Sequence, residues 1–145
     1  MCVTLRGMRA LVQRVSRASV TADGEPIAAI GPGLLVLLGI THDDDAATAD
    51  RVAQKVGGLR LFPDAEGRMN EPLGPREVLV VSQFTLYGDV SKGNRPSYVA
   101  AAGPGHAEPL YERVADGLGA QRGRFGAHME VALVNDGPVT VLVEL

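Results

Sequence analysis

Tryptophan is absent from this 145-residue chain, and only three Phe and three Tyr are present, so the core must rest on Val, Leu, Ile and Ala. The single cysteine, Cys2, excludes an internal disulfide framework and argues against a cysteine-based metal site. No apolar run approaches the roughly 20 residues that a membrane-spanning helix needs. No charged segment followed by an apolar one opens the chain as a secretion signal would. We therefore expect a cytoplasmic protein without a membrane segment.

An excess of positive charge is also lacking. The formal net charge of −3 argues against broad binding along a nucleic-acid backbone, which depends on neutralising many phosphates. It does not exclude a protein that grips one end of an RNA, through a local group of cations and a pocket for the terminal nucleotide. The length fits one domain with a real core, and 46% hydrophobic residues fit a globular protein.

Familiar hydrolytic and metal-binding motifs are missing as well. The chain has no Gly-x-Ser-x-Gly elbow and no His-Glu-x-x-His helix. We interpret His42 and His106 as loop or surface residues, and His128 precedes the last strands. The run Asp43-Asp44-Asp45 is interpreted as the start of a helix, because acidic side chains suit the positive end of a helix dipole. No metal or cofactor site is expected.

The hydrophobic pattern predicts strands first, then two inserted helices, then strands again. We expect a single-domain α+β fold in which two amphipathic helices accompany a barrel-like sheet, mostly antiparallel or mixed. Asp23-Gly24 is a strong hairpin turn signal. Residues 68–74 are expected to be irregular and residues 87–97 to form a loop. Strands are expected at 9–15, 18–30 (a hairpin), 34–40, 59–62, 78–86, 129–134 and 139–145, and helices at 46–59 and 108–118.

The most informative stretch runs from Val78 to Leu86. Its first half is apolar and β-branched, as in a strand buried on both faces. Its second half brings Ser82, Gln83 and Thr85 to the end of the strand, where small polar side chains form a rigid shelf for a ligand. A second polar stretch, residues 135–140, is interpreted as a turn between two apolar runs.

Together these stretches resemble the two signature motifs of D-aminoacyl-tRNA deacylases, which hydrolyse the ester between a D-amino acid and tRNA. The motifs read Ser-Gln-Phe-Thr-Leu at 82–86 and Asn-Asp-Gly-Pro-Val-Thr at 135–140. Residues 1–7 precede the matching domain, 8–145, as either a frayed extension or the product of an upstream start codon. The resemblance extends to Gln13-Arg14-Val15, Asp64-Ala65-Glu66-Gly67, Arg95-Pro96-Ser97 and Gly123-Arg124-Phe125.

The resemblance implies a homodimeric proofreading hydrolase that needs no cofactor. Its substrate would be D-aminoacyl-tRNA, and also glycine mischarged on tRNA-Ala, whereas L-aminoacyl-tRNA would be rejected. Gly137-Pro138 would form a cis element that enters the partner subunit's site, where its carbonyl groups leave no room for an L side chain. The 2′-hydroxyl of the tRNA's terminal adenosine would assist the attacking water.

Thr85, Ser82, Gln83 and Phe84 are the candidate catalytic group. Thr85 is either a nucleophile or a group that orients the ester, and the lack of a visible base favours the second role. The backbone around Phe84 and Thr85 is expected to supply N–H donors to an oxyanion, commonly worth ~3–4 kcal/mol each. Ser82 and Gln83 are expected to shape the shelf.

The candidate substrate-binding residues beyond Gly137 and Pro138 also follow from the resemblance. Arg14 would brace the Gly-Pro turn, and is otherwise an ordinary surface arginine. Phe125 and Met129 would line the pocket for the terminal adenosine, since an aromatic ring stacks on adenine; otherwise they are plain core residues. The candidate contacts to the phosphates near the 3′ end of the tRNA are Lys92, Arg95, Arg122 and Arg124. The alternative is that these side chains are simply solvated.

Two other functions stay open at this point. A non-catalytic nucleic-acid-binding module of the same fold would bind RNA or DNA ends without turnover. A general small-ester hydrolase would cleave amino-acid esters that lack RNA.

Overall fold

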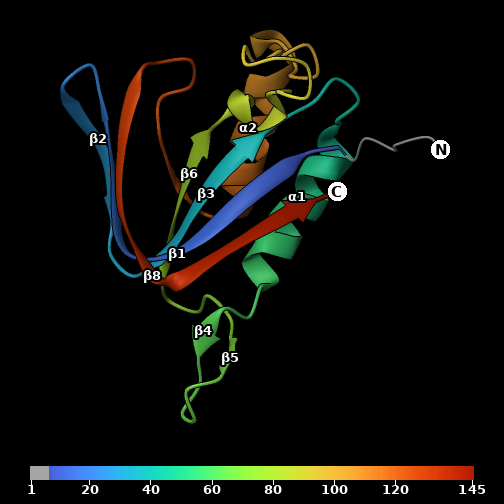
Figure 1. The fold of residues 1–145 in the computed structure, drawn as a ribbon. Coiled ribbons are helices and arrows are strands. Elements are labelled where there is room, and N and C mark those ends of the chain that lie inside the picture. Colours follow the sequence, from blue (N-terminus) through green and yellow to red (C-terminus); the bar gives the residue numbers. More distant parts are fainter. Residues whose placement is uncertain (1–6) are drawn as a thin grey trace.

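The structure is a computed structural model, and it describes residues 7–145. The predicted extension, residues 1–7, therefore lies outside the described residues except for Gly7. Two helices, one 3-10 turn and eight strands follow one another in the described chain (Figure 1). They are β1 (Arg9–Ala22), β2 (Glu25–Ile30), β3 (Gly33–Gly39), α1 (Ala46–Gly58), β4 (Phe62–Pro63), β5 (Met69–Glu71), β6 (Glu77–Ser82), η1 (Phe84–Tyr87), α2 (Pro104–Gly117), β7 (Gln121–Arg122) and β8 (Met129–Glu144).

Six strands form one strongly curved sheet. The order is β2-β1-β3-β6-β7, and β8 pairs with the other side of β1. The side chain of Gln121 links β7 to β2, the last and first strands of this order, because it accepts from Ala29 N at 3.2 Å. It also donates to Glu77 on β6 at 3.2 Å. The predicted α+β fold, a barrel-like mixed sheet with two helices in one domain, is confirmed. Strands β4 and β5 form a separate hairpin, so residues 69–71 were wrongly expected to be irregular.

Strand β1 organises the sheet because it is long enough to pair with three others. Its first half lies antiparallel to β3 and its second half to β2, while β8 follows both halves on the opposite side. The predicted strand 9–15 and the first arm of the predicted hairpin are thus one continuous strand. Asp23-Gly24 joins β1 to β2, as predicted.

The parallel pair β3 and β6 forms the centre of the core. Alternate residues of each strand supply two hydrophobic clusters, one beneath the helices and one inside the curve of the sheet. Leu34 and Val80 belong to the first cluster, and Leu35 and Leu79 to the second. Both faces of these strands are buried, which explains why the sequence is apolar without alternation.

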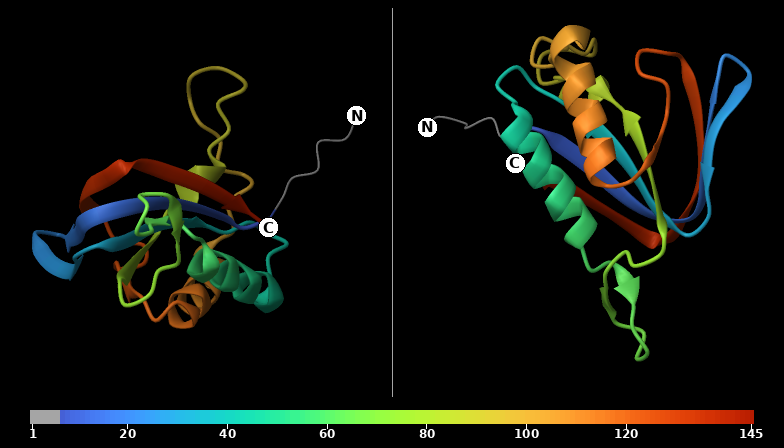
Figure 2. Two further views of the ribbon diagram at one scale, coloured as in Figure 1. Left: turned by 90° about the horizontal axis from the view of Figure 1, so that it is seen from below. Right: turned by 180° about the vertical axis from the view of Figure 1, so that it is seen from behind.

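Helices α1 and α2 pack side by side over one face of the sheet (Figure 2). The carboxylate of Asp45 caps α1 by accepting from Thr48 N at 2.9 Å. Helix α2 begins four residues before the predicted start, because Pro104 occupies its first turn, where a missing N–H costs nothing. An ion pair of 2.8 Å between Arg113 and Asp50 joins the two helices.

Asp44 departs from the predicted role of its acidic run. Its carboxylate is buried and accepts from Met8 N at 2.9 Å and Thr41 N at 2.8 Å, so it fastens the start of β1. Burial raises the pKa of this carboxyl, and the two hydrogen bonds oppose the rise. His106, interpreted as a loop or surface residue, is exposed and lies in the first turn of α2, with Nε2 2.8 Å from the carbonyl oxygen of Asp44.

The stretch 135–140, which was predicted to be a turn, instead contains a bulge within β8. Thr140 pairs with Gln13 and Asn135 pairs with Val15, so residues 136–139 stand opposite Arg14 alone. Both flanking segments pair with β1 in the same direction, and the chain therefore does not reverse. The two strands predicted around the turn are one strand with an interruption.

Candidate active site

The polar residues predicted at the end of β6 lie where the chain leaves the sheet. We call residues 82–87 the corner. Strand β6 ends at Ser82, and Gln83 N still donates to Leu38 O at 2.8 Å. From Phe84 onward the chain leaves the sheet as the 3-10 turn η1, which places Phe84 and Thr85 at the surface. The strand is therefore shorter than predicted, because its last residues turn into η1.

Two backbone N–H groups of the corner have no acceptor among the residues that the structure describes. Leu86 N donates to Gln83 O at 3.2 Å and Gly88 N donates to Thr85 O at 2.9 Å. Within residues 7–145, neither a carbonyl nor a side chain accepts from Phe84 N or Thr85 N. Neighbouring donors at the start of a helical turn are suited to hold an oxygen that carries negative charge.

The hydroxyl of Thr85 is oriented by its neighbour. Gln83 donates from Nε2 to Thr85 Oγ1 at 2.6 Å. A hydroxyl that accepts this bond keeps its own proton for donation to another group. The pair thus presents an O–H donor beside the two free N–H groups.

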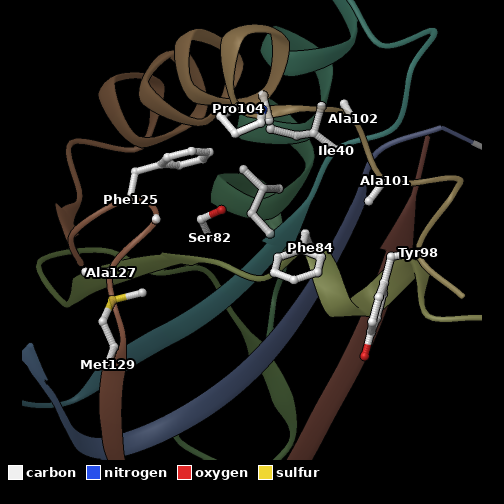
Figure 3. A pocket seen from close by; sticks show the side chains of 13 residues that line it. Ile40, Ser82, Phe84, Tyr98, Ala101, Ala102, Pro104, Phe125, Ala127 and Met129 are labelled. Carbon is white, nitrogen blue, oxygen red and sulfur yellow. The ribbon is translucent and has the colours of Figure 1, made fainter. Parts of the chain in front are cut away.

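A cavity of about 460 Å³ opens beside the corner (Figure 3). Ser82 and Phe84 line it from the corner, and the Ser82 hydroxyl points into it. Most of the remaining wall is apolar and comes from two segments, residues 98–107 and 125–129. A cavity of this size and lining fits a flat, apolar-faced group such as a nucleobase.

The segment 125–129 supplies one wall and carries two residues that the sequence predicted for it. Phe125 and Met129 both line the cavity. The ring of Phe125 lies 5.6 Å from that of the buried Tyr111. Tyr111 donates to Val80 O at 3.1 Å, and burial raises the pKa of its hydroxyl to about 12, so it remains a neutral anchor. This contact ties the wall to the central strand.

The opposite wall, residues 98–107, was not predicted. Tyr98 stands edge-on to Phe84 with ring centroids 5.1 Å apart, and small residues such as Ala101 and Ala102 complete the wall. Hydrogen bonds from Thr41 Oγ1 to Ala100 O (2.5 Å) and from His42 Nε2 to Val99 O (2.6 Å) hold this segment. Its only sequence signal is that it begins directly after the motif residues Arg95-Pro96-Ser97.

The other signature motif lies elsewhere. The bulge is internally braced, since Asn135 accepts from Val139 N at 2.8 Å and donates to Thr140 Oγ1 at 3.1 Å. Arg14 donates to Asp136 O at 2.8 Å and to Leu61 O at 2.6 Å. The Gly137-Pro138 peptide bond is cis, and both residues are exposed.

The bulge and the corner lie at opposite ends of the central strands (Figure 1). On β3, Leu38 is beside Ser82 whereas Leu34 is beside Arg14. Four residues of strand separate these positions by roughly 13 Å. Neither Gly137 nor Pro138 lines the cavity of its own chain.

The four candidate phosphate contacts divide into two pairs. Lys92 and Arg95 are exposed on the loop after the corner. Arg122 forms ion pairs with Glu112 and Asp116, and Arg124 lies 3.7 Å from Glu25. Only the first pair is therefore uncommitted to a neighbouring carboxylate within residues 7–145.

Over the described part of the chain, no group of three or more His, Cys, Asp or Glu is placed to hold a metal ion. None of the helices at 46–58 and 104–117 is long and apolar enough to cross a membrane.

The fold and the site define a single-domain α+β protein with an apolar cavity beside backbone N–H donors. A family model described as D-Tyr-tRNA(Tyr) deacylase matches residues 11–144, and the chain belongs to this family. A D-aminoacyl-tRNA deacylase of Symbiobacterium thermophilum is 56% identical, over 94% of this chain and 95% of the relative. A D-aminoacyl-tRNA deacylase of Mycolicibacterium smegmatis is also 56% identical, over 95% of this chain and all of the relative.

Two solved structures have the same fold. One, described as c-Myc DNA Unwinding Element Binding Protein, has a TM-score of 0.88 and 41% identity, and the match covers 94% of this chain and 98% of the other. The second, described as a probable eukaryotic D-amino acid tRNA deacylase, has a TM-score of 0.82 over 95% and 99% of the two chains. At 14% identity, the second match speaks for the fold alone.

Proposed function

We propose that the protein is a D-aminoacyl-tRNA deacylase that hydrolyses the ester between a D-amino acid and the terminal adenosine of tRNA. The observation that carries this proposal is the corner, where Ser82 and Phe84 line an apolar cavity and the free N–H groups of Phe84 and Thr85 and the oriented Thr85 hydroxyl follow directly in the chain. Membership of the deacylase family and relatives of that name support the same reaction.

The cavity is assigned to the terminal adenosine. Its wall is largely apolar, and Phe125 offers an aromatic face of the kind on which single-stranded bases stack. With the base there, the ribose and its ester extend toward Phe84 and Thr85 at the rim. Lys92 and Arg95 lie on the neighbouring loop and are assigned to the phosphates that precede the adenosine.

In this reaction water attacks the carbonyl carbon of the ester, and the ribose oxygen leaves with a proton. The N–H groups of Phe84 and Thr85 stabilise the negative charge that develops on the carbonyl oxygen. Thr85 orients the ester as a hydrogen-bond donor, because Gln83 already occupies one lone pair of its oxygen. The 2′-hydroxyl of the adenosine assists the water, which accounts for a site without a histidine base.

The Gly137-Pro138 bulge is assigned to the cavity of a partner subunit in a homodimer. Its distance from the corner of its own chain and its exposure support this assignment. Strand β8 also exposes Leu133, Val134 and Leu142, apolar residues that a second copy would cover. In the complete site the bulge's carbonyl groups would exclude an L side chain. Glycine, which has no side chain, would pass, so glycyl-tRNA-Ala is a further substrate.

The test is hydrolysis of one tRNA charged in parallel with D-tyrosine and L-tyrosine. Fast release of D-tyrosine with L-tyrosine spared is expected. Equal release of both would overturn the chiral exclusion while keeping an esterase. Cleavage of D-tyrosine methyl ester at a comparable rate would instead favour a small-ester hydrolase that does not need the RNA.

A non-catalytic nucleic-acid-binding module is the second candidate. It is favoured by the likeness to the structure described as a DNA unwinding element binding protein. Binding of uncharged tRNA without hydrolysis of either ester would establish this function in place of deacylation.

A further inference from the structure

Arg9 lies next to the corner without lining the cavity, and no motif of the sequence includes it. Glu144, Arg9 and Gly39 are register partners on β8, β1 and β3, so they share one face of the sheet. Arg9 Nε donates to Glu144 Oε2 at 3.1 Å. This bond holds the Nε edge of the guanidinium against β8.

Gly39 lets the corner pack directly on strand β3. A Cβ at this position would lie 3.0 Å from Tyr87 Cε2 and 3.2 Å from both Leu86 Cβ and Gln83 O. Such distances are tighter than ordinary Cβ contacts, so a side chain at this position would push η1 away from the sheet by a few tenths of an ångström. The missing side chain also leaves Arg9 a path from β1 across β3 to η1.

Arg9 uses this path to hold the end of η1. It donates to Leu86 O at 2.7 Å, and its guanidinium carbon lies 4.7 Å from the centre of the Tyr87 ring. The carbonyl groups at the end of a helical turn lack partners within the turn. Tyr87 is buried and donates to Gly7 O at 2.6 Å, so the Arg9 contact is made to a segment that is already anchored on its far side.

We propose that Arg9 is a positioning residue for the deacylation. Held by Glu144, it fixes the Leu86 carbonyl, and through this carbonyl it fixes the preceding N–H groups of Phe84 and Thr85 relative to the cavity. The inference rests on the proposed function for what the corner does. The contact of Arg9 with the corner does not depend on that function.

The kinetic test uses Arg9→Met, which keeps an apolar stem but removes both donors. A displaced corner lowers kcat for D-tyrosyl-tRNA by about 10- to 100-fold, whereas KM stays within about twofold because two walls of the cavity, residues 98–107 and 125–129, lie outside the corner. Arg9→Lys restores part of kcat, since its ammonium can still donate to Leu86 O. The matched control is Arg17→Met, an exposed arginine of the same strand, with unchanged kcat and KM. An unchanged kcat in Arg9→Met, or a fall that only matches its unfolded fraction, would overturn the proposal.

Amide hydrogen exchange without substrate separates this proposal from the proposed function. Peptides covering residues 84–88 are expected to exchange about tenfold faster in Arg9→Met than in the wild type or Arg17→Met. Unchanged exchange would overturn the positioning role at any level of activity. If the wild-type protein hydrolyses no aminoacyl-tRNA and Arg9→Met still exchanges faster, Arg9 braces the corner but has no catalytic consequence.

Discussion

The corner and the bulge are both rigid, polar interruptions of a β-strand, but they lie in opposite surroundings. The corner borders a cavity and is held from the side by Arg9 and Gly39. The bulge projects into solvent, although Asn135 and Arg14 brace it with hydrogen bonds from within and below. One segment offers room for a substrate, and the other offers rigid backbone without room of its own.

An exposed segment with this much internal bracing is unusual, because exposed loops normally gain little from being held in one conformation. Gly137 has a φ of 150°, and a Cβ there would lie 2.7 Å from Val139 N, so the bulge depends on glycine for its shape. Preorganised backbone of this kind is useful where it meets a ligand without paying an ordering cost. Each segment therefore supplies what the other lacks, in keeping with the proposal that they form two halves of one site in a dimer.

The largest predicted effect comes from separating these halves. Gly137→Ala distorts the bulge, which by the proposal also forms part of the partner's cavity, and Ala127→Trp fills the cavity, so each is expected to lower deacylation of D-tyrosyl-tRNA by about 100-fold or more. If the halves meet across a dimer, random mixing of the two variants makes heterodimers in which one of the two sites is intact. Activity should then return to about a quarter of the wild-type value.

The mixture must be prepared by co-expression or by unfolding and refolding, since subunits of a stable dimer do not exchange freely. Each variant mixed with itself through the same procedure is the control. A mixture that stays as inactive as its components would overturn the proposal that the bulge of one subunit completes the cavity of the other.

Sequence reasoning located both segments, and the family resemblance implied that they meet across two subunits, but it did not predict the path of the chain through the bulge. The apolar runs at β3 and β6 predicted strands buried on both faces, because burial on both sides removes any need for alternation. The bulge was mistaken for a turn because Gly-Pro composition marks a break in the ladder without saying which way the chain continues. That direction depends on pairing with β1, more than a hundred residues earlier in the chain.

Other residues of the cavity and of its surroundings belong to no sequence pattern that predicts their roles. The wall at 98–107 is built largely of small residues such as Ala101 and Ala102, whose role is to leave space. Asp44 and Asp45 are neighbours in one acidic run, yet only the second caps a helix, while the first is buried against Met8. Arg9 stood out in no motif because its partners Glu144 and Leu86 are distant in sequence.

A smaller effect is expected from the hydroxyl of the corner. Thr85→Val keeps the shape of the side chain but removes its hydrogen bond to the ester, worth about 1.5–2 kcal/mol, so kcat should fall roughly 10- to 30-fold. Single-turnover hydrolysis of D-tyrosyl-tRNA measures this loss, and Thr21→Val on β1 is the matched control. A loss to background, together with a D-tyrosyl adduct on the acid-quenched wild type, would instead make Thr85 a nucleophile.

The smallest effect is expected from Arg14, which braces the bulge. Arg14 donates through two different nitrogens to Asp136 O and Leu61 O, and a lysine ammonium does not reproduce this planar fork. Arg14→Lys should loosen the bulge and lower the ratio of D- to L-tyrosine release by about three- to fivefold, mainly because the L ester is hydrolysed faster. Arg17→Lys on the same strand should leave the ratio unchanged. A ratio that falls because D-tyrosine release slows, with L-tyrosine still spared, would mean that the bulge positions the substrate but does not exclude the L side chain.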